Sequence, residues 1–94
     1  MSQLFSGQLF SLGQLLITRV AANCLDLDDV STAVRRHGSG DWGEVCQEDK
    51  QANDEALLEG TRLLSAYRDR HGIKFWLITE ADRSSTTVLL PEDN

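Results

Sequence analysis

The chain has 94 residues, of which 40% are hydrophobic and only one is proline, and its formal net charge is −6. This length and composition fit one globular domain, and they exclude a disordered chain or a pair of domains. The acidic balance also argues against direct nucleic-acid binding, which depends on Lys and Arg neutralising phosphates.

The first eleven residues form an uncharged segment in which Gln-Leu-Phe-Ser occurs twice, at residues 3–6 and 8–11. The segment has no basic start and its apolar stretch is interrupted, which is unlike a signal peptide or a membrane span. We interpret residues 1–11 as an N-terminal arm or extension and residues 12–94 as a single α+β domain of a cytoplasmic protein with no membrane partner. The arm offers a homo-oligomer contact to a neighbouring chain or an open sheet edge through Leu4, Phe5, Leu9 and Phe10.

Residues 14–18 predict a short strand, because they are apolar and end in β-branched residues. A helix is expected over residues 27–36, with Asp26 as its N-cap. Acidic residues in its first turn and Arg35 and Arg36 in its last turn suit the helix dipole.

A second helix is expected from Asp41, as N-cap, to Glu59, with Gly60 as the stop. We expect Trp42 to anchor this helix to the sheet and Cys46 to be a small core residue. Its apolar side is thin and consists of Trp42, Val45, Cys46, Ala52 and Ala56, with Leu57 and Leu58 near its end. Most of the helix surface then faces water or a partner.

Three β-rich runs complete the chain, at residues 62–68, 73–79 and 85–90, and residues 69–72 predict a hairpin turn between the first two. The expected fold class is therefore α+β: two helices packed on one face of an antiparallel sheet of three to four strands.

The net charge is confined to residues 38–60, because acidic and basic residues balance on either side of this stretch. On the expected second helix, acids three, four or seven residues apart share one side. They predict an acidic ridge that binds a basic protein surface, made of Asp41, Glu44, Glu48, Glu55 and Glu59. Two further binding candidates are Trp42 and Arg83, whose guanidinium could recognise a carboxylate or phosphate.

The sequence contains no decisive catalytic or metal-ligand motif. Cys24 and Cys46 lie 22 residues apart, and His37 and His71 are the only histidines. Because a zinc site needs several convergent ligands, this pattern indicates no metal site. We expect reduced thiols and no cofactor.

Two segments, GDWGEVCQED at residues 40–49 and WLITEADRSSTTVLLPE at residues 76–92, together with RLLSAY at residues 62–67, resemble a family of small uncharacterised bacterial proteins. Its members are encoded on plasmids, phages and integrative elements and are often labelled plasmid-related. The resemblance covers residues 12–92 and implies a mobile-element setting without implying an activity. The added arm and the absence of an expected proline after Thr18 are departures that concern the N-terminal packing.

These features predict a small acidic, non-enzymatic interaction protein of a bacterial mobile element. Its acidic helix would bind a basic surface of a host defence or nucleic-acid-binding protein. An alternative, by analogy of fold alone, is a ribonuclease-toxin-like α+β domain that acts on RNA with His71, Arg83 and Tyr67 as catalytic residues. The shortage of basic residues counts against RNA cleavage.

Overall fold

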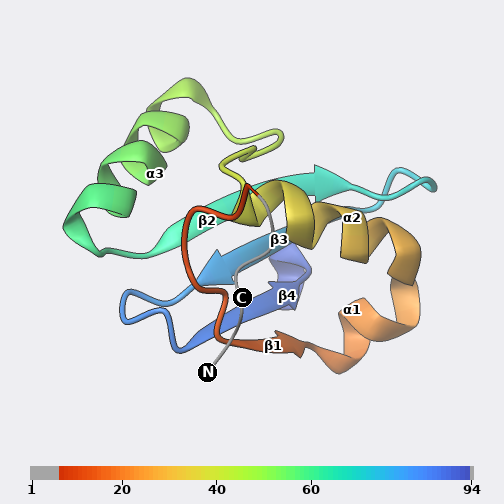
Figure 1. The fold of residues 1–94 in the computed structure, drawn as a ribbon. Coiled ribbons are helices and arrows are strands. Elements are labelled where there is room, and N and C mark those ends of the chain that lie inside the picture. Colours follow the sequence, from red (N-terminus) through yellow and green to blue (C-terminus); the bar gives the residue numbers. More distant parts are fainter. Residues whose placement is uncertain (1–6, 94) are drawn as a thin grey trace.

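Four strands form one mixed sheet in the order β1-β4-β3-β2, and three α-helices of the described residues lie beside it (Figure 1). The computed structural model describes residues 7–93. In chain order, the elements are β1 (Gln14–Ile17), α1 (Arg19–Cys24), α2 (Leu27–Gly38), α3 (Gln47–Glu59), β2 (Leu63–Arg68), β3 (Lys74–Thr79), β4 (Ser85–Leu89) and the 3₁₀ turn η1 (Pro91–Asp93).

The expected α+β class is confirmed, and the strands lie within one or two residues of their expected bounds. α2 begins directly after Asp26, whose side chain accepts a hydrogen bond of 3.1 Å from the Asp29 backbone N–H. This is the geometry of an N-cap, which satisfies one of the free donors at the start of a helix.

Two features of the N-terminal half differ from the prediction. β1 pairs with β4 in parallel, so the sheet is mixed rather than antiparallel. A parallel neighbour requires a long crossover, and the helices and the other two strands between β1 and β4 supply one. The helix α1 was not predicted; the Thr18 side chain caps it by accepting a hydrogen bond of 3.1 Å from the Ala21 N–H.

Part of the expected N-terminal arm belongs to the core. Phe10 is 8% exposed, and its ring lies edge-on to the His37 ring at a centroid distance of 5.3 Å. Phe10 is therefore unavailable to a neighbouring chain, which corrects its assignment to the oligomer contact. Leu9 is exposed, whereas Leu4 and Phe5 lie outside the described residues.

A buried imidazole joins α2 to the sheet. His37 is fully buried; its Nδ1 contacts the Ser65 hydroxyl on β2, and its Nε2 lies 2.8 Å from the Thr79 hydroxyl on β3. The Thr79 hydroxyl lies 2.7 Å from that of Thr86 on β4, which donates to the Leu12 carbonyl over 2.8 Å. One continuous chain of hydrogen bonds thus links α2, three strands and the segment before β1.

The direction of each hydrogen bond in this chain follows from its last member. The Leu12 carbonyl can only accept, so Thr86 donates its one hydroxyl proton there and must accept from Thr79. Thr79 then accepts from the Nε2–H of His37, and Nδ1 is left to accept from Ser65. The imidazole is therefore the neutral tautomer that carries its proton on Nε2.

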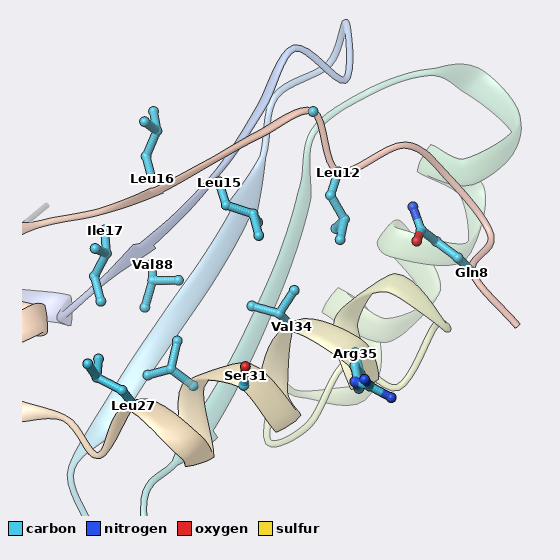
Figure 2. Close-up of a pocket in the computed structure, with 12 residues that line it drawn as sticks. Gln8, Leu12, Leu15, Leu16, Ile17, Leu27, Ser31, Val34, Arg35 and Val88 are labelled. Carbon is cyan, nitrogen blue, oxygen red and sulfur yellow. The ribbon is translucent and has the colours of Figure 1, made fainter. Parts of the chain in front are cut away.

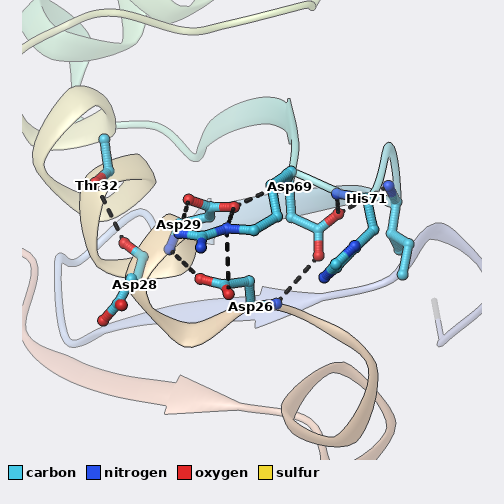
Figure 3. A network of polar contacts seen from close by, with 8 residues as sticks. Asp26, Asp28, Asp29, Thr32, Asp69 and His71 are labelled. Carbon is cyan, nitrogen blue, oxygen red and sulfur yellow. Dashed lines mark hydrogen bonds and ion pairs between the residues drawn. The ribbon is translucent and has the colours of Figure 1, made fainter.

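The β2–β3 hairpin is tied to the first turn of α2 by charged groups (Figure 3). The Arg70 guanidinium makes two hydrogen bonds of 3.1 Å to the Asp29 carboxylate and lies 3.2 Å from that of Asp26. Asp69, buried in the hairpin, accepts from three backbone N–H groups, one of them that of Asp26. Burial by itself would raise the pKa of Asp69, but these hydrogen bonds outweigh it and lower the pKa.

We predict that His37 causes the free energy of unfolding to decrease as the pH falls from 6.5 to 4. Burial, and secondarily the charge of Arg83, lower the pKa of His37 from 6.5 to about 4. Below pH 6.5 the unfolded chain binds a proton that the folded chain excludes. The free energy of unfolding therefore falls by up to roughly 3 kcal/mol as the pH approaches 4, and urea unfolding at both ends of this range measures the fall.

His37→Gln is the control, because an amide can accept from Ser65 and donate to Thr79 but does not titrate. The variant should lack the part of the pH dependence that lies between pH 6.5 and pH 4. An equally steep fall in the variant would show that another group is responsible.

Candidate functional site

The helix α3 lies beside β2, the strand at one edge of the sheet (Figure 1). Two buried residues, Asn53 and Ala56, face the sheet. The Asn53 amide bonds to both backbone groups of Leu64, accepting from its N–H over 3.0 Å and donating to its carbonyl over 2.7 Å. Asn53 thus pairs with β2 as a neighbouring strand would, and most of the remaining circumference of α3 is exposed.

The helix is shorter than predicted, because it begins at Gln47 rather than near residue 41. Gly43 has a φ of 73°, a left-handed conformation that a helix cannot contain, and it forms a β-bridge with Ala66. A Cβ at this position would lie 2.0 Å from the Ala66 carbonyl oxygen. Residues 42–44 therefore follow the edge of β2, and Cys46 takes the N-cap position.

Asp41 and Glu44 consequently lie outside the predicted ridge, and Asp41 does not cap α3. The Asp41 carboxylate accepts two hydrogen bonds from Arg36, of 2.7 and 3.2 Å, and Glu44 lies 3.0 Å from the Arg68 guanidinium. The hydrogen bond from Arg36 lowers the pKa of Asp41. Because an arginine compensates each of these acids, neither contributes to an unpaired acidic surface.

Three residues of the expected apolar side are exposed and do not belong to the core: Cys46, Ala52 and Leu58. Cys46 precedes the first residue of α3 and takes its N-cap position. Cys24 and Cys46 are both free thiols and both exposed.

The acidic surface that remains is the outward side of α3, which we call the α3 face and define by Glu48, Glu55, Leu58 and Glu59. Leu58 is 90% exposed, more than any other large hydrophobic side chain of the described residues. It lies one turn from Glu55 and directly before Glu59. None of the three glutamates takes part in an ion pair within residues 7–93.

Two of these glutamates oppose the stability of the helix that carries them. Glu55 and Glu59 are four residues apart on an exposed surface, where like charges repel. Glu59 also lies in the last turn, where the helix dipole is negative and the turn has no basic residue. Folding therefore does not explain these carboxylates, whereas solubility or binding does.

Trp42 is inaccessible to a partner, because it is only 4% exposed. Its indole Nε1–H donates to the Asp54 carboxylate over 3.1 Å. Trp42 therefore joins the segment along β2 to α3, which is the anchoring role expected of it.

Arg83 is bound within the protein rather than presented to a ligand. Its cation lies at the C-terminal end of α3, where the dipole favours a positive charge. The Cζ atom also lies 5.6 Å from the centre of the Phe10 ring. The guanidinium donates over 2.6–3.3 Å to four backbone carbonyls, those of Ala56, Thr61, Glu80 and Ala81.

The three residues of the alternative catalytic set lie apart. His71 is in the β2–β3 turn and Arg83 in the β3–β4 turn, at opposite ends of β3. A strand of this length separates them by roughly 20 Å. Tyr67 is 2% exposed and donates its hydroxyl proton to the Asp41 carbonyl over 2.6 Å, and burial raises its pKa.

Within residues 7–93, no group of three or more His, Cys, Asp or Glu is placed to hold a metal ion. No helix in that part of the chain combines the length and the apolar character needed to cross a membrane. Comparison of the chain with protein-family models, curated proteins and solved structures finds no match. The surfaces of the molecule are therefore the guide to its function.

Leu58 was not predicted as a site residue, because the sequence places it beside Leu57 on the expected apolar side. A signal was present nevertheless. Consecutive helical residues point about 100° apart, so two adjacent leucines at the end of a thin apolar stripe cannot both face the core. The structure half-buries Leu57 and exposes Leu58.

We predict that Gly43→Ala destabilises the protein more than Gly60→Ala. Both glycines have a positive φ, which costs an alanine about 1–2 kcal/mol. Space around Gly60 is open, whereas a Cβ at Gly43 overlaps the Ala66 carbonyl, which adds about 1–3 kcal/mol. Thermal unfolding of both variants tests this, and equal losses would contradict the bridge between Gly43 and β2.

We also predict that Glu59→Lys stabilises the protein by about 0.5 kcal/mol, because it removes a repulsion and places a cation at the negative end of α3. Glu48→Lys is the matched control. It removes an acid from the first turn, where acids are favourable, and should destabilise by a similar amount. Denaturant unfolding measures whether each variant gains or loses stability. A loss of stability in Glu59→Lys would show that this carboxylate stabilises the fold.

Proposed function

We propose that this chain is a small non-enzymatic interaction protein of a bacterial mobile element, which acts in the cytoplasm and binds a basic protein surface through the α3 face. The target we propose is a nucleic-acid-binding protein of the host, including a defence complex, whose phosphate-binding surface the carboxylates occupy. One observation carries this proposal: Leu58 is 90% exposed among glutamates that make no ion pair within the described residues.

The α3 face combines the two components of a protein-binding surface. An exposed aliphatic side chain gains affinity when a partner covers it, since apolar surface is removed from water. The carboxylates around it select a partner of opposite charge and speed the encounter with that partner. A metal ion or a small anion would use neither the position nor the apolar character of Leu58.

The charge of α3 favours a basic protein over nucleic acid. The helix carries five acidic residues and one lysine, a net charge of −4. Carboxylates on successive turns have Cβ atoms about 5–6 Å apart, so they can meet several Lys or Arg side chains of one surface. Phosphate groups would be repelled by the same helix.

The α3 face is also preorganised, which reduces the entropy lost on binding. Asn53 fixes the middle of the helix to β2 and Arg83 bonds the carbonyl of Ala56 near its end. Neither residue belongs to the α3 face. A partner can therefore bind without rearranging the helix.

The test begins with a pull-down by the tagged full-length protein from its host lysate at low and high salt, followed by mass spectrometry. We expect a basic nucleic-acid-binding protein that is retained at low salt and lost at high salt. The purified captured protein is then titrated calorimetrically with defined variants. Leu58→Ala should weaken binding by about tenfold, the loss typical of a central apolar contact.

Two double variants separate the α3 face from net charge. Glu55→Lys/Glu59→Lys and Glu44→Lys/Glu92→Lys each change the formal charge from −6 to −2, because each substitution adds two units. Only the first pair lies on the α3 face, so only the first should abolish capture. Capture of the same proteins by the parent protein and the first variant would overturn the proposal.

A further inference from the structure

Among the described residues, β1 is an edge strand that lacks the protection such strands usually have. All four of its residues are exposed, although three are aliphatic: Leu15 (55%), Leu16 (42%) and Ile17 (40%). Natural edge strands generally carry a lysine, a proline or a bulge that prevents pairing with another chain. β1 carries no lysine or proline, and residues 1–18 contain no charged side chain.

The opposite edge of the sheet, on β2, is closed. The Ala66 N–H donates to the Trp42 carbonyl over 3.2 Å, and the Ala66 carbonyl accepts from the Glu44 N–H over 2.7 Å. Asn53 bonds both backbone groups of Leu64 on the same edge. Among the described residues, β1 has β4 on one side and no strand on the other.

An apolar groove of about 500 Å³ runs between β1 and α2 (Figure 2). Leu15 and Ile17 point toward the helix side of β1, and Leu16 points away from it. Leu27, which is 59% exposed, lies at the Ile17 end of the groove, and Arg35 lies at the other end. Both faces of β1 therefore present aliphatic side chains beside an open backbone edge.

We propose that β1 pairs in an antiparallel manner with β1 of a second copy of this chain, so that the sheet continues through a two-fold axis at Leu16. A two-fold interface places the same surface on both copies, and that surface must complement itself. The backbone, the side chains and the flanking charges of β1 each meet this requirement.

The hydrogen-bonding direction along β1 determines which backbone groups are free. The N–H groups of Gln14 and Thr18 each donate over 3.0 Å to carbonyls on the β4 side. Because the direction alternates along a strand, the N–H and C=O groups of Leu15 and Ile17 point to the open edge.

These free groups select one register. Two opposite residues in an antiparallel pair exchange two hydrogen bonds when the backbone N–H and C=O groups of each residue point toward the other strand. If Leu15 lies opposite Ile17 of the second copy, the backbone N–H and C=O groups that Leu15 and Ile17 turn to the open edge are all hydrogen-bonded, on both strands. The two Leu16 side chains then meet at a close, non-hydrogen-bonded position on the axis. All of these cross-strand pairs are aliphatic.

Charged side chains on α2 are also complementary under the two-fold axis at Leu16. α2 runs opposite to β1: Leu27 lies at one end of the groove, with Asp28 as the next residue of the helix, and Arg35 lies at the other end. Neither Asp28 nor Arg35 takes part in an ion pair within residues 7–93. The two-fold axis reverses the ends and brings Arg35 of each copy to the end where Asp28 of the other lies.

The first test is the molar mass of the full-length protein by light scattering over a range of concentrations. We expect a mass of twice 10.5 kDa. Leu16→Lys places two cations face to face and removes the Leu16 contact, so it should weaken dimerisation on the order of a hundredfold. Leu9→Lys is the matched control, because Leu9 is 56% exposed but lies outside β1.

The two variants distinguish β1 from the N-terminal arm as the dimer contact. A monomeric parent protein at every concentration overturns the proposal, and so does a dimer that survives Leu16→Lys. Dissociation by Leu9→Lys instead would assign the contact to the arm. Glu55→Lys/Glu59→Lys should leave the mass unchanged, so failure of this proposal and failure of the α3 face are separate results.

A disulfide test reads the register directly and does not depend on the stability of Leu16→Lys. In a background where the free thiols are removed by Cys24→Ser and Cys46→Ser, Leu16→Cys should form a covalent dimer under oxidised glutathione. Opposite residues at a non-hydrogen-bonded position have Cα atoms about 4.5 Å apart, within disulfide range. Leu15→Cys should not form the dimer, because Leu15 faces Ile17 rather than itself; the reverse result excludes this register.

Discussion

The fold depends on keeping one neutral imidazole buried at the centre of a directional chain of hydrogen bonds. His37 is fully buried, and each of its nitrogens has a single role: Nε2 donates to Thr79 and Nδ1 accepts from Ser65. A protonated ring would place a charge in the core near the Arg83 cation, which is why the pKa of His37 is lowered. The stability of the helix–sheet contact is thereby linked to pH.

The same chain of hydrogen bonds positions both edges of the sheet. Through Ser65 it reaches β2, the strand along which residues 42–44 and α3 are fastened. Through Thr86 it reaches the carbonyl of Leu12, two residues before β1. The buried polar groups therefore connect the two surfaces that we propose for binding, although neither surface contains any of these groups.

The two edges of the sheet differ in chemistry as well as in exposure. The β2 edge is closed, and the helix beside it exposes Leu58 and glutamates that make no ion pair within residues 7–93. Within residues 7–93, the β1 edge has no strand beside it, and β1 itself is uncharged and mostly aliphatic. Acidic and apolar surfaces at opposite edges suit two different partners, a basic protein at α3 and a second copy at β1.

Local patterns in the sequence determined much of this protein. The confinement of net charge to residues 38–60 is a property of the sequence itself. The N-cap at Asp26 and the three C-terminal strands depend on neighbours within a few residues, and the structure contains them as expected. Contacts between distant residues decided the rest. The bridge from Gly43 to Ala66 delays the start of α3, and Glu44 pairs with Arg68, which is 24 residues away. The Ala56 carbonyl, 27 residues before Arg83, accepts a hydrogen bond from the Arg83 guanidinium. Periodicity cannot reveal such partners, because the tertiary structure alone brings them together.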